Sequence, residues 1–369
     1  MVDDILAEAV DSGASDIHFE PGADKMIVKF RLDGELKVVE ELPKFISENV
    51  IARLKVLSGL LTYRNDIPQE GRISSDTDSK SESIVTDKRL AIFPTIHGQR
   101  AVIRLFYENA GLMELDQLGL GDFILSNLKH IAASNQGVLL LTGPAGSGKS
   151  TTLGAMLRYI LGKYPGKSIV TLEDPVERDI EGVTQVQISP GGEMTFPVAL
   201  RSLLRQDPQV LMIGEIRDAE TAKITVEAGL TGHLLMSTMH SGSPAGALLR
   251  MLEMGIEPYQ VTSSVSGVVN QRLVRKLCEN CKKAAENANE FTAAGCDKCM
   301  ETGFHGRALI AEMVLMDGEL RKAILAKSDM DELEKILKQR GHMNMAQDGM
   351  RLVSSGITTR DEVRKVCSF

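Results

Sequence analysis

The chain has 369 residues, which at about 150 residues per domain predicts two or three domains with a sizeable core. Hydrophobic residues make up 43% of the chain and charged residues 25%, which are ordinary values for globular domains and exclude a disordered or fibrous protein. Acidic residues number 50 against 42 lysines and arginines, a formal charge of −8, so the chain as a whole does not attract the phosphate backbone of nucleic acids.

The first part of the chain mixes helices with short strands. Apolar residues recur at spacings of three and four in two segments, which is typical of amphipathic helices. Asp33-Gly34 lies between two strand-like segments, and this dipeptide is a strong signal for a β-hairpin. The elements expected here are helices at 5–10 and 44–61, strands at 26–32, 35–39, 72–74 and 90–93, and an exposed polar loop at 74–83.

Beyond about residue 121 the pattern changes to strands alternating with helices, which is typical of a parallel α/β sheet. Most of the expected core strands are continuous apolar runs, as in strands that helices cover on both faces. These strands are 138–141, 168–172, 210–213 and 234–237. The domains that we expect are an N-terminal domain at 1–108, a linker at 109–120, an α/β core at 121–277, a cysteine-bearing segment at 278–310 and a helical region at 311–369.

Residues 143–150 fit the pattern G-x-x-x-x-G-K-[ST] and lie between an expected strand and a helix expected at 151–161, which is the context that a phosphate-binding loop requires. Backbone N–H groups of such a loop surround the phosphates, its lysine reaches the β and γ phosphates, and its serine ligates Mg²⁺. The alternative is a glycine-rich turn without a ligand, which the joint occurrence of pattern and context disfavours. The residues expected to bind nucleotide are Gly143, Pro144, Gly146, Ser147, Gly148, Lys149, Ser150 and Thr151, with Ser150 also a magnesium ligand.

Acidic side chains follow two of the expected core strands, at the sheet edge where ligands of open α/β sheets bind. Glu215 comes after the strand at 210–213 and is our candidate for polarising the attacking water. Glu173 and Asp174 come after the strand at 168–172, where carboxylates can hold Mg²⁺ or its waters. Taken alone, Glu215 would be a surface acid and the other two a solvated turn, but the phosphate loop upstream favours the catalytic interpretation of Glu215.

His233 and His240 flank the strand at 234–237, and we expect both imidazoles near the same sheet edge. One interpretation is that they sense the γ-phosphate. The other is a hydrogen-bonded histidine of the core or of a turn, which is the commoner role of a histidine taken alone.

Four of the five cysteines form two C-x-x-C pairs separated by 14 residues, Cys278 with Cys281 and Cys296 with Cys299. This spacing is close to that of zinc sites built from two such pairs. Four thiolates close a tetrahedral site and leave no position for a substrate, so we expect structural Zn²⁺. The alternative is a set of reduced, unliganded thiols, and Cys367 has no partner at motif spacing.

Taken together, these segments resemble the ATPases of type II secretion and type IV pilus systems, the GspE, PulE and PilB group. The resemblance covers nearly the whole chain, and the ordered set is more specific than any one segment. The matching segments are the Walker A loop at 143–151, an Asp box at 172–177, a Walker B segment at 204–218, a His box at 230–240, the cysteine pairs, and shorter motifs at 14–21, 31–34, 68–72, 97–100, 271–275 and 303–307.

The resemblance implies a PAS-like α+β N-terminal domain followed by a RecA-like ATPase domain with a zinc-binding subdomain and a helical C-terminal region. It implies a ring-shaped homo-hexamer that binds ATP and Mg²⁺ and hydrolyses ATP to ADP and phosphate. Arg89, Arg100 and Arg104 lie at positions similar to the arginine-bearing strands of the family, so the resemblance implies that they complete the nucleotide site. The catalytic residues expected are Lys149, Glu173, Glu215, His233 and His240.

The function so implied is a motor that drives assembly of pseudopilus or type IV pilus subunits, and protein secretion, through an inner-membrane platform protein. No apolar run reaches the roughly 18 residues of a membrane-spanning helix. We therefore expect a cytoplasmic protein. The resemblance implies that a platform protein and a membrane-recruitment protein hold it on the cytoplasmic face of the inner membrane. The chain begins close to the motif at 14–21, so we expect a member, or a piece of one, without the extreme N-terminal domain of the family.

Two other functions stay open at this point. One is a nucleotide-gated scaffold with little turnover, which an intact Glu215 argues against. The other is a DNA-translocating RecA-like motor, which the acidic charge disfavours. No nucleic-acid partner is expected.

Overall fold

The computed structural model describes residues 1–73, 85–107, 114–189, 191–285, 290–339 and 341–367. The polar loop expected at 74–83 lies outside the described residues. The chain divides into two compact units. The first comprises Met1–Gly111, Cys278–Lys282 and Ala293–Gly306, and the second comprises Leu112–Leu277, Lys283–Thr292 and Arg307–Phe369. Both cysteine pairs therefore group with the N-terminal part of the chain.

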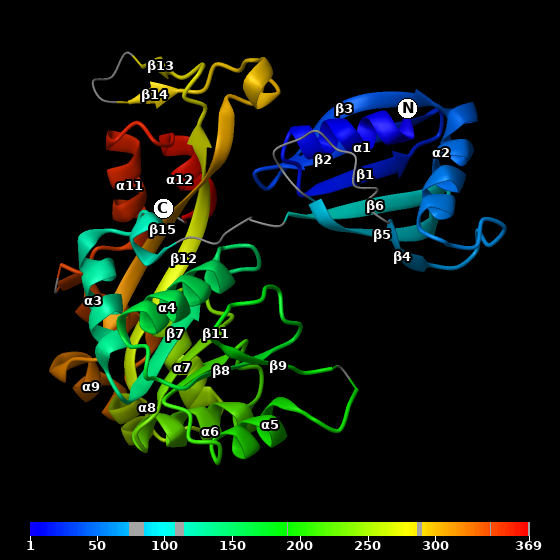
Figure 1. The fold of residues 1–369 in the computed structure, drawn as a ribbon. Coiled ribbons are helices and arrows are strands. Elements are labelled where there is room, and N and C mark those ends of the chain that lie inside the picture. The colour runs from blue at the N-terminus through cyan, green and yellow to red at the C-terminus, as the bar shows by residue number, and fades with distance from the viewer. Residues whose placement is uncertain (74–84, 108–113, 190, 286–289, 340, 368–369) are drawn as a thin grey trace. The chain divides into compact units, whose positions relative to one another are not determined.

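The first unit is built on a six-stranded antiparallel sheet in the order β3-β2-β1-β6-β5-β4 (Figure 1). Two helices, α1 (Val2–Asp11) and α2 (Lys44–Leu57), contribute apolar residues to its core. The hairpin at Asp33-Gly34 is confirmed, because both residues have positive φ values, 50° and 98°, as a two-residue turn requires. The strands are β1 (Asp16–Pro21), β2 (Lys25–Leu32), β3 (Glu35–Pro43), β4 (Gln69–Ile73), β5 (Val85–Thr95) and β6 (Gly98–Tyr107).

Side chains of this sheet alternate between two environments. In β2, Met26, Val28, Phe30 and Leu32 are buried in the core with α1 and α2, while the residues between them are more exposed. Alternation with a period of two is what a strand with one apolar face produces. The opposite face of the sheet carries charged side chains together with apolar ones such as Val38 and Phe93, which are exposed.

The second unit contains a seven-stranded sheet in the order β15-β12-β7-β11-β10-β8-β9, in which the strands from β12 to β9 pair in parallel. The four expected core strands are confirmed as β7 (Gly137–Thr142), β8 (Ile169–Glu173), β10 (Val210–Ile213) and β11 (Leu234–Met239). The sequence pattern does not predict β9 (Thr184–Gln187), β12 (Val265–Leu277) or β15 (Phe304–Leu315). β12 and β15 mix charged and amide residues with apolar ones, and β9 buries none of its residues fully.

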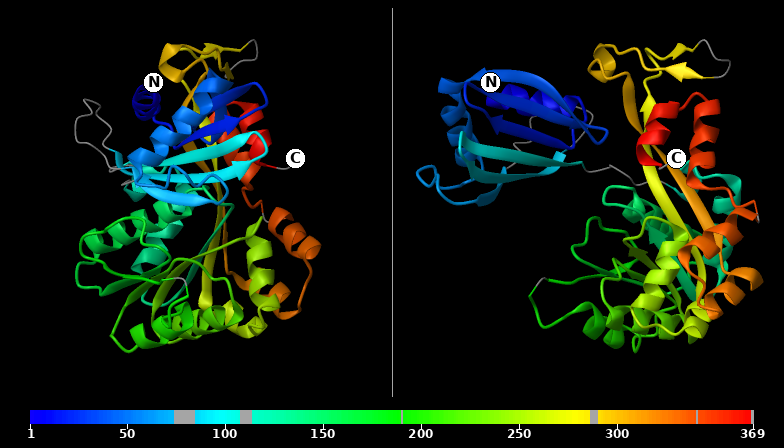
Figure 2. Two further views of the ribbon diagram at one scale, coloured as in Figure 1. Left: turned by 90° about the vertical axis from the view of Figure 1, so that its right-hand side faces the viewer. Right: turned by 180° about the vertical axis from the view of Figure 1, so that it is seen from behind.

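Helices cover both faces of this sheet (Figure 2). Leu139 and Leu141 of β7 pack in one core with residues of α3 and α4, whereas Val138 and Leu140 pack in a second core with residues of α5 to α10. The expected α/β fold class is thereby confirmed. The helices are α3 (Asp122–Ala133), α4 (Lys149–Lys163), α5 (Phe196–Leu203), α6 (Ala219–Leu230), α7 (Pro244–Glu253), α8 (Pro258–Ser264), α9 (Gly318–Leu325) and α10 (Met330–Gln339).

The C-terminal part is helical after β15. The helices α11 (Met345–Ser354) and α12 (Arg360–Val366) close a small core with β12 and β15, and Cys367 is buried in it. β12 and β15 lie side by side in the sheet (Figure 1). Among the helices that the structure describes, none combines the length and the apolar character needed to cross a membrane.

Candidate nucleotide-binding site and metal centre

The phosphate loop connects the carboxyl end of β7 to the first residue of α4. Three of its glycines, Gly143, Gly146 and Gly148, have φ values of 141°, 74° and 88°, a backbone region that other residues disfavour. A Cβ atom at Gly143 would lie 2.5 Å from the carbonyl oxygen of Gln271 in β12, so glycine is required there. Because β7 is parallel to its neighbours, the loop lies at the carboxyl edge of the sheet, where ligands of such folds bind.

Lys149, at the start of α4, folds back over the loop. Its Nζ atom donates to the carbonyl oxygens of Gly143 at 2.8 Å and Pro144 at 2.9 Å. Burial lowers the pKa of Lys149; the charge of Glu215 opposes this shift and that of Arg272 adds to it. A phosphate group would be a stronger partner for this ammonium than two neutral carbonyls, since charge-assisted hydrogen bonds are about twice as strong as neutral ones.

Polar atoms without partners mark the loop as a binding site. Ser147 Oγ is buried and has no hydrogen-bond partner among the described residues, while Gln271 Nε2 ties the loop to β12 through the carbonyl oxygen of Ser147, 2.9 Å away. Orphaned buried groups are rare in folded proteins and point to an absent ligand or water. The side chain of Ser150 is exposed in the first turn of α4, where its hydroxyl can reach a phosphate-bound Mg²⁺. The residues present therefore fit a nucleotide and its metal ion.

Glu215, which follows β10, is held at both carboxylate oxygens. Oε1 lies 3.0 Å from Nε2 of His240, which follows β11, and Oε2 accepts a hydrogen bond from Nε of Arg217 at 2.8 Å. Arg217 also lies 3.7 Å from Asp174, which follows β8. The hydrogen bond and the charge of Glu215, with a smaller contribution from Asp174, raise the pKa of Arg217. The structure thus brings three predicted residues together and adds Arg217, which the sequence analysis missed although it lies inside the matched segment 204–218.

Glu173 is engaged elsewhere. Its Oε1 atom accepts hydrogen bonds from Oγ1 of Thr171 at 2.7 Å and from Nε2 of Gln185 in β9 at 2.9 Å. These neutral donors hold the carboxylate beside the edge strand, and its catalytic role stays a prediction.

The two histidines do not lie near the same sheet edge, so that expectation is wrong. β11 runs between them, with His233 before its first residue and His240 after its last. At about 3.3 Å per residue the strand separates them by roughly 20 Å. Nδ1 of His233 lies 3.2 Å from the carbonyl oxygen of Ala228, near the end of α6. We therefore assign no phosphate-sensing role to His233.

Charged side chains form a row across the face of the first unit's sheet that does not pack against α1 and α2. In the strand register Arg31 pairs with Asp16, Asp16 with Arg104, Arg104 with Arg89, and Arg89 with Arg72. Directly paired residues share one face of a sheet, so five neighbouring strands contribute one side chain each. We call this row of four arginines and one aspartate the arginine ladder.

The arginine ladder carries more positive than negative charge. Asp16 lies 3.1 Å from Arg104 and 3.3 Å from Arg31, and Arg89 pairs with Asp87 at 2.9 Å. Guanidinium groups are suited to bidentate binding of phosphates. A hollow of about 490 Å³ lies beside the ladder, and the residues that line it include Asp16, Arg72, Arg89 and Arg104.

Three arginines depart from the sequence analysis. Arg100 lies on β6 but contacts Glu20 at 3.3 Å and Nδ1 of His18 at 3.2 Å, so it stands apart from the ladder. Arg31 and Arg72 join the ladder although neither was a predicted site residue. The signal was their place in the motifs at 31–34 and 68–72, but only the strand register shows which arginines they accompany.

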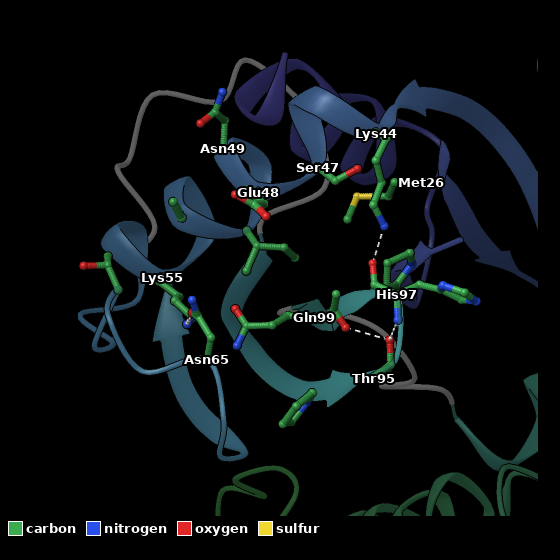
Figure 3. Close-up of a pocket in the computed structure, with 16 residues that line it drawn as sticks. Met26, Lys44, Ser47, Glu48, Asn49, Lys55, Asn65, Thr95, His97 and Gln99 are labelled. Carbon is green, nitrogen blue, oxygen red and sulfur yellow. Dashed lines mark hydrogen bonds between the residues drawn. The ribbon is translucent and has the colours of Figure 1, made fainter. Parts of the chain in front are cut away.

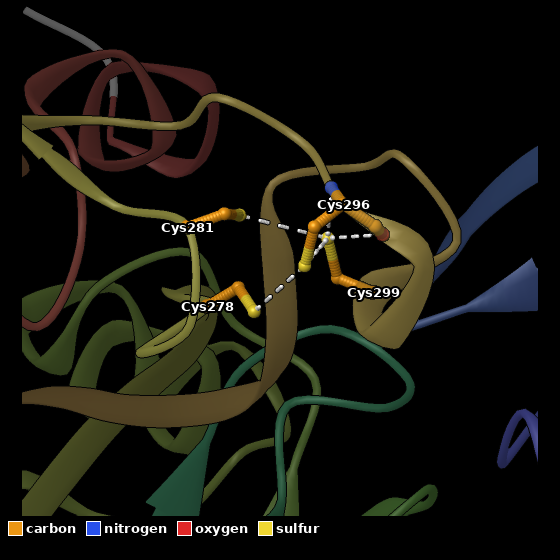
Figure 4. Close-up of side chains that lie close together, drawn as sticks. All are labelled: Cys278, Cys281, Cys296 and Cys299. Carbon is orange, nitrogen blue, oxygen red and sulfur yellow. Dashed lines mark hydrogen bonds between the residues drawn. The ribbon is translucent and has the colours of Figure 1, made fainter.

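The four cysteines of the two pairs gather into one cluster (Figure 4). Their sulfur atoms all lie within 4.8 Å of one another. Sγ of Cys278 is 3.9 Å from that of Cys296, and Cys281 is 3.8 Å from Cys299. Four thiolates about 2.3 Å from a tetrahedral Zn²⁺ would be about 3.8 Å apart, so the cluster has the dimensions of a zinc site.

The cluster is also prepared electronically for a cation. Burial raises the pKa of Cys299, but backbone N–H groups of Cys296 and Gly303 and the neighbouring thiols outweigh it and lower the pKa to about 7. Burial and hydrogen bonding to the other three thiols raise the pKa of Cys281 to about 12. A second thiolate is unfavourable beside the first until a cation compensates, which is the behaviour of a metal site. Cys367 lies outside the cluster, and burial raises its pKa.

A phosphate loop at the carboxyl edge of a parallel sheet, with helices on both faces and a glutamate after β10, defines a RecA-like phosphate-loop ATPase. Solved structures with a similar fold include the pilus retraction motor PilT with bound ADP, at a TM-score of 0.64 and 23% identity over 99% of this chain and 96% of that one. The ATPase DotB of Yersinia pseudotuberculosis has a TM-score of 0.72 and 22% identity over 99% of this chain and 92% of that one.

The family follows from sequence matches over almost the full length. The family model described as type II/IV secretion system protein matches residues 1–365, and the chain belongs to this family. The putative type II secretion system protein E of Escherichia coli K12 is 40% identical over 383 residues, covering 100% of this chain and 76% of that protein. The type II secretion system ATPase E of Vibrio cholerae is 39% identical, covering 99% and 74%. The type IV pilus assembly ATPase PilB of Thermus thermophilus is 38% identical, covering 98% of this chain but only 42% of its own length. The expected family is confirmed.

Proposed function

We propose that the chain is an ATP-hydrolysing motor that powers assembly of pseudopilus or type IV pilus subunits, and protein secretion, through an inner-membrane platform protein. The observation that carries this proposal is the placement of Glu215 with His240, Arg217 and Asp174 at the sheet edge that bears the phosphate loop. The proposal draws further support from relatives whose names are those of secretion and pilus ATPases.

In this proposal each part of the site has one task. The loop glycines and Thr151 present backbone N–H groups to the phosphates, and Lys149 leaves its two carbonyl partners to bind the β and γ phosphates. Mg²⁺, when bound, neutralises charge on the phosphates, with Ser150 and Asp174 as its protein-side partners. Glu215 orients and polarises the attacking water, and His240 and Arg217 fix its carboxylate.

We further propose that the arginine ladder supplies positive charge to the triphosphate when the motor fires. An arginine that closes on the γ-phosphate stabilises charge in the transition state and couples hydrolysis to movement. Arg89 and Arg104 belong to the ladder and were expected from the sequence. Arg72 was not expected, and we include it because it pairs with Arg89 in the strand register. Arg100 stays a predicted member of the nucleotide site.

Replacing Arg89 with glutamine should lower ATP turnover by about 10²-fold, the usual effect of removing a charge-stabilising donor. Arg72→Gln should act in the same direction. Arg53→Gln is the matched control, because Arg53 is an exposed arginine of α2 that lies 3.3 Å from Asp3 and outside the ladder. Steady-state phosphate release measures all three. Turnover of Arg89→Gln equal to that of Arg53→Gln would exclude the ladder from catalysis.

The partners follow from the same proposal. The working form is a homo-hexamer, recruited by a membrane protein to the cytoplasmic face of the inner membrane, where it acts on the platform protein. Structural Zn²⁺ in the cysteine cluster completes the set of cofactors. We propose no nucleic-acid partner, in keeping with the formal charge of −8.

Light scattering coupled to size-exclusion chromatography, with and without a non-hydrolysable ATP analogue, tests the motor proposal together with an assay of phosphate release. A nucleotide-dependent hexamer that releases phosphate supports it. Nucleotide binding and assembly without phosphate release would instead identify a nucleotide-gated scaffold. A monomer under both conditions that binds DNA in a salt-dependent manner would favour a DNA-directed protein.

A further inference from the structure

Buried polar side chains hold local turns in some places and join distant elements in others. In the first unit, Lys55 of α2 is fully buried, and its Nζ atom donates to Oδ1 of Asn65 at 2.9 Å (Figure 3). It also donates to the carbonyl oxygen of Arg64 at 2.6 Å, so this lysine ties the end of α2 to the turn that follows. In the second unit, Asn270 of β12 is 2% exposed and contacts three segments that lie far from it in the sequence.

Every hydrogen-bonding position of the Asn270 amide is used. Nδ2 donates to the carbonyl oxygen of Gly242 at 2.8 Å and to Oε1 of Glu312, in β15, at 2.8 Å. Oδ1 accepts from Nη1 of Arg272 at 2.8 Å and from Oγ1 of Thr142, the last residue of β7, at 3.3 Å. An asparagine amide has two N–H donors and an oxygen with two lone pairs, so these four partners fix its orientation.

The contacts of Asn270 connect the phosphate loop to the candidate catalytic pair. Gly242 follows His240 by two positions, and Nε2 of His240 lies 3.0 Å from Oε1 of Glu215. Thr142 pairs with Asn270 in the strand register and comes directly before the first glycine of the loop. One buried amide therefore contacts both the strand that leads into the loop and the segment that carries His240.

Other anchors of this segment are held less firmly. The carbonyl oxygen of Gly242 also accepts from Nη2 of Arg272 at 3.3 Å, but Arg272 is itself oriented by its hydrogen bond to Asn270. The carbonyl oxygen of His240 accepts from Nη1 of Arg250 at 3.2 Å, and Arg250 is exposed. A buried network whose polar groups are all satisfied is rigid. Of these contacts, that of Asn270 is therefore the best suited to fix the position of the segment.

We propose that Asn270 is a positioning residue for ATP hydrolysis: its amide holds Gly242, and thereby keeps His240 against Glu215 in a fixed position relative to the phosphate loop. This inference rests on the proposed function, in which Glu215 polarises the attacking water. Asn270 acts through His240 and not on the nucleotide. Loss of its amide should therefore slow hydrolysis and spare nucleotide binding.

Asn270→Ala should lower kcat about 10- to 100-fold, because a displacement of about 1 Å near the chemistry can cost that much, while KM changes by less than about 3-fold. Asn127→Ala is the matched control, because the amide of Asn127 in α3 donates to the carbonyl oxygen of Phe123 in its own helix. It should leave both constants unchanged. Steady-state phosphate release over a range of ATP concentrations measures kcat and KM.

His240→Ala separates positioning from a general loss of structure. If Asn270 acts through His240, Asn270→Ala should lower kcat by less than about 2-fold once His240 is absent. The same loss of kcat with and without His240 would show that the two residues act independently, and would overturn the proposal.

If Asn270→Ala does not fold, a paired substitution still isolates the contact with Gly242. Asn270→Asp together with Glu312→Gln keeps the side-chain volume, an oxygen for Arg272 and a donor–acceptor pair with β15, but it offers no N–H to Gly242. It should lower kcat about 10-fold. Glu312→Gln alone still offers an oxygen to Asn270 and should keep the parent kcat. Equal kcat in these two variants would exclude a role for the Gly242 contact.

The histidine NMR signals give a second readout that needs no hydrolysis. In deuterated protein with histidine labelled at Cε1, the His240 signal is the one that disappears in His240→Ala. Asn270→Ala, or the paired variant, should move this signal in the nucleotide-free protein, and Asn127→Ala should leave it in place. If Glu215→Gln does not change turnover, the assigned role of Glu215 fails, yet a moved His240 signal still supports Asn270 as the anchor. An unmoved His240 signal would overturn the inference itself.

Discussion

Replacing Glu215 with glutamine should lower the rate of ATP hydrolysis by about 10²- to 10⁴-fold, the usual contribution of a positioned general base. Glutamine keeps the size of the side chain and an oxygen for His240, 3.0 Å away, but it has no negative charge to polarise water. Nucleotide binding should change little, because the phosphates are held by the loop and Lys149. Steady-state phosphate release and calorimetric titration with ADP measure the two properties separately.

Lys149→Ala and Glu220→Gln make this prediction specific. The lysine variant should lose nucleotide affinity together with turnover, since it removes the ammonium that lies over the loop. Glu220 is an exposed acid of α6, five residues from Glu215, and it pairs with Arg201 on the surface. Glu220→Gln should therefore keep both turnover and ADP binding. Turnover by Glu215→Gln at the level of Glu220→Gln would rule out the assigned role.

Much of the fold can be predicted from the sequence, because strands that are buried on both faces of a sheet appear as continuous apolar runs. The strands β7, β10 and β11 are almost purely apolar, and the turn at Asp33-Gly34 uses the residues that positive φ angles demand. β12 is different. It holds Asn270, Gln271 and Arg272 in its middle. Nδ2 of Asn270 donates to Oε1 of Glu312 and Nε2 of Gln271 donates to the carbonyl oxygen of Ser147, and both partners are far away in the sequence. A local pattern does not show those partners.

The candidate site divides in the same way. The phosphate loop is a continuous segment whose geometry follows from its own glycines, so sequence alone indicates it. The pairing of His240 with Glu215, and the separation of His233 from both, depend on which end of β11 each residue occupies. The arginine ladder depends on the register of five strands. Arg72 and Arg104 lie 32 positions apart, and only the sheet brings them to one row.

Removal of the metal from the cysteine cluster should unfold its loops and leave the phosphate loop able to bind nucleotide. Without a cation, the cluster confines four thiols within 4.8 Å, and the pKa of about 12 at Cys281 shows how strongly a second thiolate is resisted there. Structural zinc of this type contributes about 10–16 kcal/mol in isolated zinc-finger peptides. The cluster belongs to the first unit and the phosphate loop to the second, so the two losses should separate.

Cys299→Ser is the sharpest variant for this prediction. It removes the thiol that ionises first, because its pKa is about 7. The same sulfur accepts hydrogen bonds from the N–H groups of Cys296 and Gly303. Elemental analysis should show one Zn²⁺ per chain in the parent and far less in the variant. Affinity should fall as the pH drops, because protons compete with the metal for Cys281, whose pKa is about 12, and it should fall more steeply below about pH 7, where Cys299 also takes up a proton.

Cys367→Ala is the matched control, because Cys367 is buried in the core of α11 and α12, where it is 8% exposed, and lies outside the cluster. It should keep its zinc even if its unfolding temperature falls. Parent protein purified without chelator that contains no zinc would contradict the metal assignment, and loss of ADP binding in Cys299→Ser would contradict the separation. If Cys367→Ala keeps its zinc but loses stability, Cys367 serves packing. If Cys299→Ser loses zinc but still binds ADP, the four clustered cysteines serve the ion.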